Sequence, residues 1–128
     1  MSTPMQKSVS DRTPKTPPNR AGARAFWRQR TTAMMLVVLV PYALYVMLRI
    51  AGRDLAFVQH SLAQPWIALP LLALILTGVF HMHLGMREIL EDYIRKPLLG
   101  VTLGANTLFC LLIALAAGGA VVRLWIGV

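Results

Sequence analysis

The sequence has few charged residues and only one cysteine among its 128 residues. Charged side chains make up 14% of the chain and hydrophobic ones 56%, whereas a soluble domain usually has about 25% charged residues. Cys110 has no second cysteine for an internal disulfide or a zinc or iron–sulfur site, and we interpret it as a small buried hydrophobic residue. The long apolar blocks therefore predict a membrane protein. The single cysteine excludes a disulfide scaffold and a cysteine-ligated metal centre within the chain.

Acidic residues are scarce as well. Five Asp and Glu stand against thirteen Lys and Arg, and residues 1–30 contain seven of the basic residues but one acidic residue. An excess of basic residues often indicates nucleic-acid binding. Here the basic block directly precedes an apolar segment, so membrane topology or anionic lipid headgroups explain it more simply. We expect the lipid bilayer as a partner and no nucleic acid.

Residues 1–25 contain four prolines and no helical apolar periodicity, so we predict a disordered basic tail. The tail has no apolar core of the kind that a secretory signal peptide needs. Its arginines and its shortage of acidic residues are typical of a mitochondrial transit sequence, but the prolines would interrupt the amphipathic helix of such a sequence. We therefore favour the bacterial inner (cytoplasmic) membrane over the mitochondrial inner membrane.

Three uncharged runs are long enough to cross a bilayer, which takes about 20 residues of helix. They span residues 31–48, 66–86 and 98–122. We predict an all-α membrane protein in which residues 26–128 form one three-helix membrane anchor domain. The predicted transmembrane helices cover about residues 29–50, 66–91 and 97–124. Residues 51–65 are expected to form a short loop with room for one surface helical turn, and Asn106 is expected to hydrogen-bond a neighbouring helix.

The basic residues also predict the orientation of these helices. Ten of the thirteen Lys and Arg lie in the tail or near the connection after the second helix, and the other three are Arg49, Arg53 and Arg123. Cytoplasmic segments of membrane proteins are enriched in Lys and Arg. The N-terminus, with the connection after the second helix, is therefore expected in the cytoplasm and the C-terminus outside.

The run of residues 81–93, which closes the second helix, is the main candidate for a functional site. An ionisable side chain at membrane depth is costly and usually functional. At about 100° per residue, His81 and Asp92 lie within about 20° of each other on one helix face, about 16 Å apart along the axis. Gly78 and Gly85 lie three and four residues from His81, so a flat, bulky group could pack on the backbone beside it.

This geometry suits an axial haem ligand near a quinone-binding site. A neutral imidazole nitrogen binds haem iron, and the porphyrin would pack on the two glycines. Asp92 and Tyr93, at the helix end, could hydrogen-bond a quinone carbonyl and relay protons to it. The alternative is that His81 only hydrogen-bonds a neighbouring helix, and that Asp92 and Tyr93 form an ordinary charged helix end at the membrane interface.

The pattern H-x-x-x-G-M-x-x-x-x-x-D-Y at the end of the second of three membrane helices resembles the hydrophobic membrane anchor, or D subunit, of succinate dehydrogenase. In this sequence the pattern consists of His81, Gly85, Met86, Asp92 and Tyr93. A second element, Arg30-Thr31-Thr32-Ala33, resembles the Arg-x-Thr-Ala that opens the first helix of that family. The resemblance covers about residues 26–128.

The resemblance implies a subunit of complex II, which passes electrons from succinate to quinone in the tricarboxylic acid cycle. His81 would be one axial ligand of the iron of haem b, and Tyr93 and Asp92 would contact ubiquinone. Arg30 is a weaker candidate for contact with a haem propionate or the quinone, and an interfacial anchor is its alternative role. The chain would carry no succinate-oxidising site.

A six-coordinate haem b also needs a second axial ligand, and His83 cannot supply it because it points away from His81 on the same helix. The resemblance implies that a second three-helix cytochrome b anchor, the C subunit, provides this histidine and part of the quinone pocket. FAD and iron–sulfur clusters would belong to a flavoprotein subunit and an iron–sulfur subunit, since this chain has neither a flavin motif nor a cysteine cluster.

Two other classes of protein stay open at this stage. One is the anchor of a related fumarate reductase or another membrane cytochrome b. The redox partner and the quinone type would distinguish these proteins from a succinate dehydrogenase anchor. The other is a non-catalytic small membrane protein, such as an assembly factor or a transporter subunit. Transporters usually have internal repeats or broken helices with charges at the membrane midplane, and the sequence has neither feature.

Overall fold

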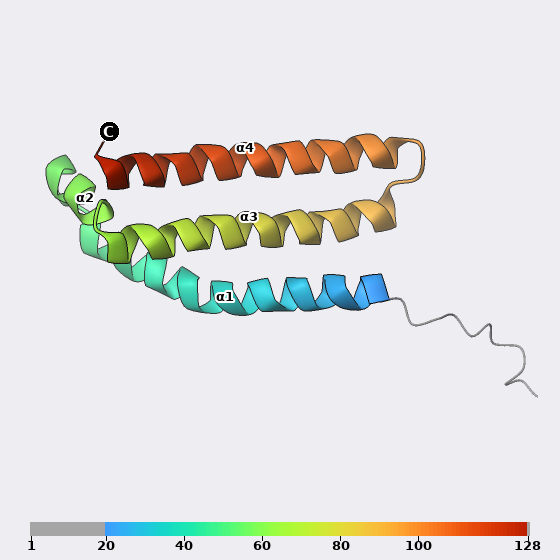
Figure 1. Ribbon diagram of the computed structural model, residues 1–128, viewed down its shortest axis with the longest axis horizontal. Coiled ribbons are helices and arrows are strands. Elements are labelled where there is room, and N and C mark those ends of the chain that lie inside the picture. Colours follow the sequence, from blue (N-terminus) through green and yellow to red (C-terminus); the bar gives the residue numbers. More distant parts are fainter. Residues whose placement is uncertain (1–19, 128) are drawn as a thin grey trace, which may run out of the picture.

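The computed structural model describes residues 20–127, which form four helices. They are α1 (Arg20–Ile50), α2 (Leu55–Leu62), α3 (Pro65–Tyr93) and α4 (Leu98–Ile126). The three long helices run antiparallel with α3 in the middle, and the short α2 lies at the end where α1 connects to α3 (Figure 1). Both α1 and α4 pack against α3, so α3 has two different seams.

The three long helices have the length and composition of membrane spans. Each apolar stretch covers 29 residues: Gly22–Ile50, Pro65–Tyr93 and Leu98–Ile126. At about 1.5 Å per residue, such a helix is about 44 Å long, which matches a bilayer with its headgroup regions. The predicted all-α architecture with three apolar helices is therefore confirmed, and this is a multi-pass membrane protein.

The start of α1 differs from the prediction. The helix begins at Arg20, whereas the predicted tail extended through residue 25 and the first helix was expected at about residue 29. Residues 20–25, which were expected to belong to the tail, are thus helical in the structure, and residues 1–19 lie outside the described range. The physical reason is that no proline lies between Pro18 and Pro41, and the Ala and Arg residues directly after Pro18 are strong helix formers.

The other boundaries agree more closely. α3 ends at Tyr93 and α4 ends at Ile126, both two residues beyond the prediction, which is within the usual uncertainty of helix ends. The segment predicted as a loop contains the eight-residue helix α2. Gly52, in the turn before α2, has a φ of +73°, a conformation that glycine adopts without strain.

The seams of this layer contain few buried side chains, and they are small or polar. The buried residues are Thr32, Val46, Ala68, Asn106, Cys110 and Gly118. Many large apolar side chains on the long helices are exposed, as expected for surfaces that contact lipid or other membrane chains. Cys110 is buried and free, in agreement with its interpretation as a small hydrophobic residue.

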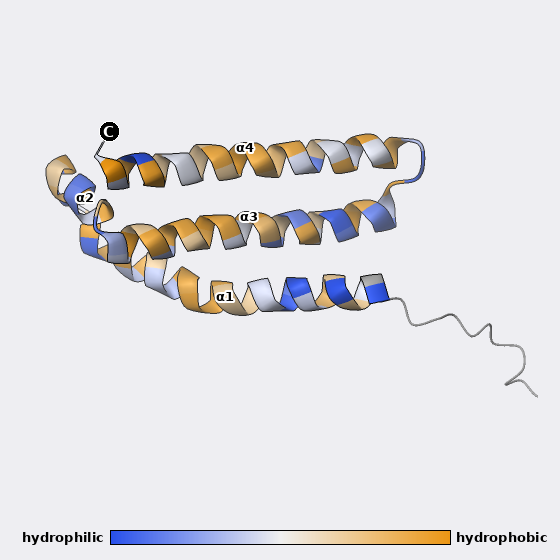
Figure 2. Ribbon diagram, viewed as in Figure 1, coloured by the Kyte–Doolittle hydropathy of each residue, from blue (hydrophilic) through white to orange (hydrophobic). Residues whose placement is uncertain are grey.

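Hydrophilic residues are most concentrated at the end of the layer where α1 begins and α3 connects to α4, and smaller hydrophilic stretches lie on α2 and near the end of α4 (Figure 2). The described basic residues at that end are Arg20, Arg24, Arg28, Arg30, Arg87, Arg95 and Lys96. The opposite end holds Arg49, Arg53 and Arg123. The start of α1 and the α3–α4 connection, whose basic residues predict the orientation, do lie at the same end of the layer. The side of the membrane on which that end lies stays a prediction.

Candidate functional site

His81 is held at the seam between α1 and α3. The imidazole Nδ1 lies 2.9 Å from the Oγ1 of Thr32, a buried residue of α1. The same hydroxyl lies 3.0 Å from the carbonyl oxygen of Arg28 and 2.9 Å from that of Gln29, one turn earlier in α1. The Nε2 atom of His81 makes no hydrogen bond within residues 20–127 and is not among their buried, unpartnered polar atoms. One ring nitrogen therefore has a hydrogen-bond partner, and the other has none within the described residues.

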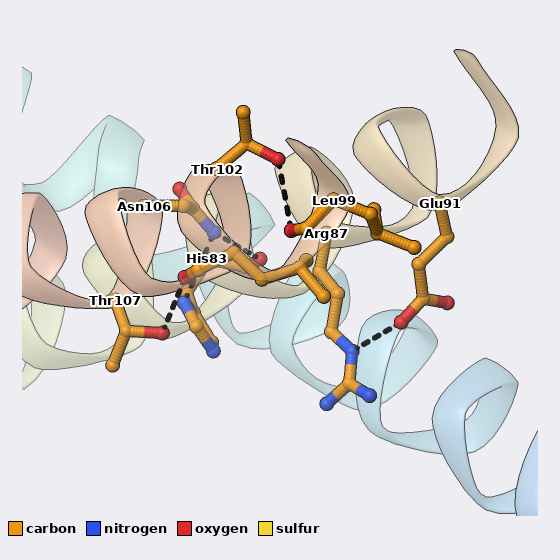
Figure 3. A network of polar contacts seen from close by, with 8 residues as sticks. His83, Arg87, Glu91, Leu99, Thr102, Asn106 and Thr107 are labelled. Carbon is orange, nitrogen blue, oxygen red and sulfur yellow. Dashed lines mark hydrogen bonds and ion pairs between the residues drawn. The ribbon is translucent and has the colours of Figure 1, made fainter. Parts of the chain in front are cut away.

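His83 lies on the other side of α3, at the seam with α4. Its Nδ1 lies 3.2 Å from the Nδ2 of Asn106, which is also 3.3 Å from the carbonyl oxygen of His83 (Figure 3). The thiol of Cys110 donates to the Oδ1 of Asn106 over 3.7 Å. Asn106 thus makes the helix–helix hydrogen bond that the sequence predicts, and the two histidines contact different helices, as their spacing predicts.

The two glycines near His81 let α1 pack closely on the surface of α3. A Cβ atom at Gly78 would lie 3.9 Å from the Cδ2 of Leu36, and one at Gly85 would lie 3.1 Å from the Nε2 of Gln29. Both neighbours belong to α1. In this chain the glycines therefore allow close helix packing, and their predicted contact with a haem stays a prediction.

Asp92 and Tyr93 are the last two residues of α3, and both are exposed. The side chain of Tyr93 is 83% exposed, more than any other large apolar or aromatic residue of the described chain. Neither residue has a side-chain hydrogen bond or ion pair within residues 20–127. Their side chains are thus available to a ligand or to another subunit at the basic end of the layer.

Arg30 lies near the start of α1, with its guanidinium 5.9 Å from the centre of the Phe26 ring. Together with Gln29 and Glu88 it lines a recess of about 470 Å³ between α1 and α3. Contact with an aromatic ring at this depth agrees with an interfacial anchor. The position also leaves the guanidinium within the open end of the α1–α3 seam.

A family model for the succinate dehydrogenase/fumarate reductase transmembrane subunit matches residues 5–121. The chain belongs to this family. The match covers most of the sequence, and it includes all three long helices up to the last turns of α4.

This transmembrane subunit is similar to curated hydrophobic membrane anchor subunits of succinate dehydrogenase. It is 33% identical to that of Rickettsia bellii over 75 residues, which are 59% of this chain and 60% of that protein. It is 29% identical to that of Rickettsia typhi over 99 residues, which are 77% of this chain and 79% of that protein. The chain therefore spans about three fifths of the R. bellii protein. No solved structure matches the chain.

The residues of this family member fit one half of a haem site. Axial ligation takes a single neutral imidazole nitrogen from each side of the iron, and His81 offers one that no residue of the described chain engages. Within residues 20–127, no group of three His, Cys, Asp or Glu gathers as a metal site. One imidazole nitrogen from this chain is the donor that one side of a haem shared with another chain would need.

Two residues beside His81 were missed by the sequence reasoning. Thr32 belongs to a motif that resembles the family, but its contact with His81 depends on the packing of α1 against α3. Gln29 was not singled out, and its Oε1 is buried without a hydrogen-bond partner within the described residues. A threonine on the neighbouring membrane helix is a possible partner for a membrane histidine, and this signal could have identified the first contact, whereas the second has no sequence signal.

Proposed function

We propose that this chain is the hydrophobic membrane anchor of a succinate:quinone oxidoreductase, and that it supplies one axial ligand of a haem b and part of a ubiquinone-reduction site. The observation that supports this proposal best is the state of His81, anchored through Nδ1 to Thr32 with Nε2 unengaged. The family match and the similarity to succinate dehydrogenase anchors support the same assignment. These relatives favour succinate dehydrogenase over a fumarate reductase.

The Nε2 atom of His81 would hold the haem iron. Bound haem b supplies a one-electron carrier within the membrane, while the protein sets its position and electronic properties. The chain contributes apolar helices that keep water away and a buried threonine that orients the ligand. Arg30 would approach a propionate or the quinone. Gly78 and Gly85 adjoin Leu36 and Gln29 of α1, so their share in the site would be the close approach of α1 that brings Thr32 to His81.

Tyr93 and Asp92 would bind the quinone at the basic end of the layer. Reduction of a quinone takes up two protons with two electrons, so the site needs a hydrogen-bond donor near the carbonyl and a path from water. The phenol of Tyr93 can donate to a quinone carbonyl, and the carboxylate of Asp92 can orient that phenol or pass protons. Arg95 and Lys96 follow after Ile94, so the site borders a polar surface.

Partner subunits would complete both sites. Because Tyr93 is 83% exposed in this chain alone, another surface must enclose the quinone head group. We assign the missing haem ligand and the rest of the quinone pocket to a second three-helix anchor together with an iron–sulfur subunit. A flavoprotein subunit would contain FAD and oxidise succinate. The basic end would face the cytoplasm of a bacterium, according to the positive-inside rule.

Purification through a tag on this chain tests the proposal. The assembly should contain a flavoprotein and an iron–sulfur protein, and its dithionite-reduced spectrum should show a b-type haem band. Cells without the chain should lose succinate:quinone reductase activity in their membranes but keep succinate oxidation with a soluble artificial acceptor. Isolation of the chain without haem or redox partners would contradict the assignment. Reporter fusions at both ends test the orientation separately, and an external N-terminus would contradict it.

A further inference from the structure

We propose that Thr32 is a positioning residue that fixes the tautomer of His81, with the ring proton on Nδ1 and a bare lone pair on Nε2. This inference rests on the proposed role of His81 as a haem ligand. It starts from one buried hydroxyl that lies within 3.0 Å of three possible partners: the Nδ1 of His81 and the carbonyl oxygens of Arg28 and Gln29.

The hydroxyl of Thr32 has one proton to donate and lone pairs with which to accept. The carbonyl oxygens of Arg28 and Gln29 can only accept, so the hydroxyl proton is directed toward them, as in the usual bond from threonine to the preceding helical turn. The oxygen then accepts from the Nδ1–H of His81. In the opposite tautomer, Thr32 would have to donate its only hydroxyl proton to Nδ1 and would give up its bond to the carbonyl oxygens of the preceding turn.

Asn106 fixes His83 in the opposite tautomer. The Nδ2 atom of an amide can only donate, and it faces both the Nδ1 and the carbonyl oxygen of His83. The orientation of the amide is consistent, because its Oδ1 accepts from the thiol of Cys110. Nδ1 of His83 is therefore the acceptor, and its proton resides on Nε2. Of the two neighbouring histidines, His81 presents a lone pair on Nε2 to a metal.

Thr32 is also well placed to hold the ring of His81 in one orientation. It is 9% exposed, its β-branched side chain has few rotamers, and its hydroxyl is tied to its own helix. A hydrogen bond from the Nδ1–H of a ligating imidazole makes the other nitrogen a better electron donor, and loss of such a bond typically lowers metal affinity by about 10- to 100-fold. The contact between α1 and α3 thereby determines the properties of the ligand.

Substitutions of Thr32 in the complete, purified complex test this inference. Thr32→Val keeps the shape and removes the hydroxyl, and we expect haem affinity to fall about tenfold or more. The haem midpoint potential should rise, because a less basic imidazole stabilises the oxidised iron less well. Thr32→Ser should restore both properties. Thr32→Cys, whose thiol is a weak acceptor, should give a potential between those of the serine and valine variants. If the valine variant does not assemble, the difference in potential between the serine and cysteine variants still tests the role of Thr32.

Thr31→Val is the matched control, because the neighbouring side chain is exposed and makes no hydrogen bond within residues 20–127. It should leave the midpoint potential and the haem content at the level of the unmodified complex. Equal potentials in the Thr31→Val and Thr32→Val complexes, or in the serine and cysteine variants, would overturn the inference about Thr32. If His81→Ala retains the full haem spectrum, the proposed haem ligand itself is wrong, and the two failures are thus distinguishable.

Discussion

The two seams of α3 use polar residues in different ways. At the seam with α4, Asn106 contacts His83 and Cys110, and both the Nδ2 and the Oδ1 of its side chain are hydrogen-bonded within the chain. At the seam with α1, the Nδ1 of His81 contacts Thr32, and the amide oxygen of Gln29 is buried without a partner in the described residues. Both histidines use Nδ1 alone within those residues, so Gln29 is what distinguishes the two seams. A polar group whose hydrogen bonds are incomplete at membrane depth usually has a further partner. The unpartnered oxygen of Gln29 therefore favours the α1–α3 seam as the one that we propose to be functional.

The largest effect that separates the two seams is expected from the histidines. His81→Ala should remove the b-type haem spectrum of the purified complex, because it deletes the nitrogen that holds the iron. His83→Ala should retain that spectrum, since its ring contacts Asn106 and presents the wrong tautomer. Difference spectra of the two variant complexes, normalised to flavin, measure both results. Loss of haem on substitution of His83 but not of His81 would reverse the assignment of the two seams.

The next effect concerns the end of α3. Tyr93→Phe keeps the ring and removes the hydroxyl, and we expect succinate:quinone reductase activity to fall by about 100-fold or more, which is the low end of the effect of a positioned proton donor. Succinate oxidation with a soluble artificial acceptor should stay unchanged, because that activity resides on the partner subunits. Tyr45→Phe, at the opposite end of the layer, is the matched control. Unchanged activity in both assays would show that Tyr93 is only an interfacial aromatic residue.

A smaller effect is expected at the α3–α4 seam. Asn106→Leu removes the amide and leaves the Nδ1 of His83 without its donor. Interhelical hydrogen bonds in membranes contribute about 0.6 kcal/mol on average and up to about 1.7 kcal/mol. We expect a lower midpoint of thermal inactivation and an unchanged haem midpoint potential. A change of potential as large as that of Thr32→Val would show that the two seams are not independent.

The sequence predicted the number and type of helices because long uncharged runs and their flanking charges determine membrane spans directly. It also predicted that His81 and His83 face different neighbours, which follows from helical periodicity alone. It did not predict the early start of α1, because the prolines and charges of the tail indicated disorder, although good helix formers follow directly after Pro18. The contacts of Thr32 and Gln29 could not be predicted, since they depend on how far α1 slides along α3.

The smallest predicted effect distinguishes a glycine within a seam from one outside it. Gly85→Ala would place a Cβ 3.1 Å from the Nε2 of Gln29, so Gln29 has to shift. Gly100→Ala meets nothing within 4 Å, and the alanine should stabilise α4 by up to about 1 kcal/mol through its higher helix propensity. We expect thermal inactivation of Gly100→Ala at or above the temperature of the unmodified complex, and that of Gly85→Ala below the Gly100→Ala value.

The haem content of both complexes should be measured in parallel, because a displaced Gln29 adjoins the turn that holds Thr32. Equal inactivation temperatures for the two variants would mean that Gln29 moves freely and that the approach of α1 does not depend on Gly85.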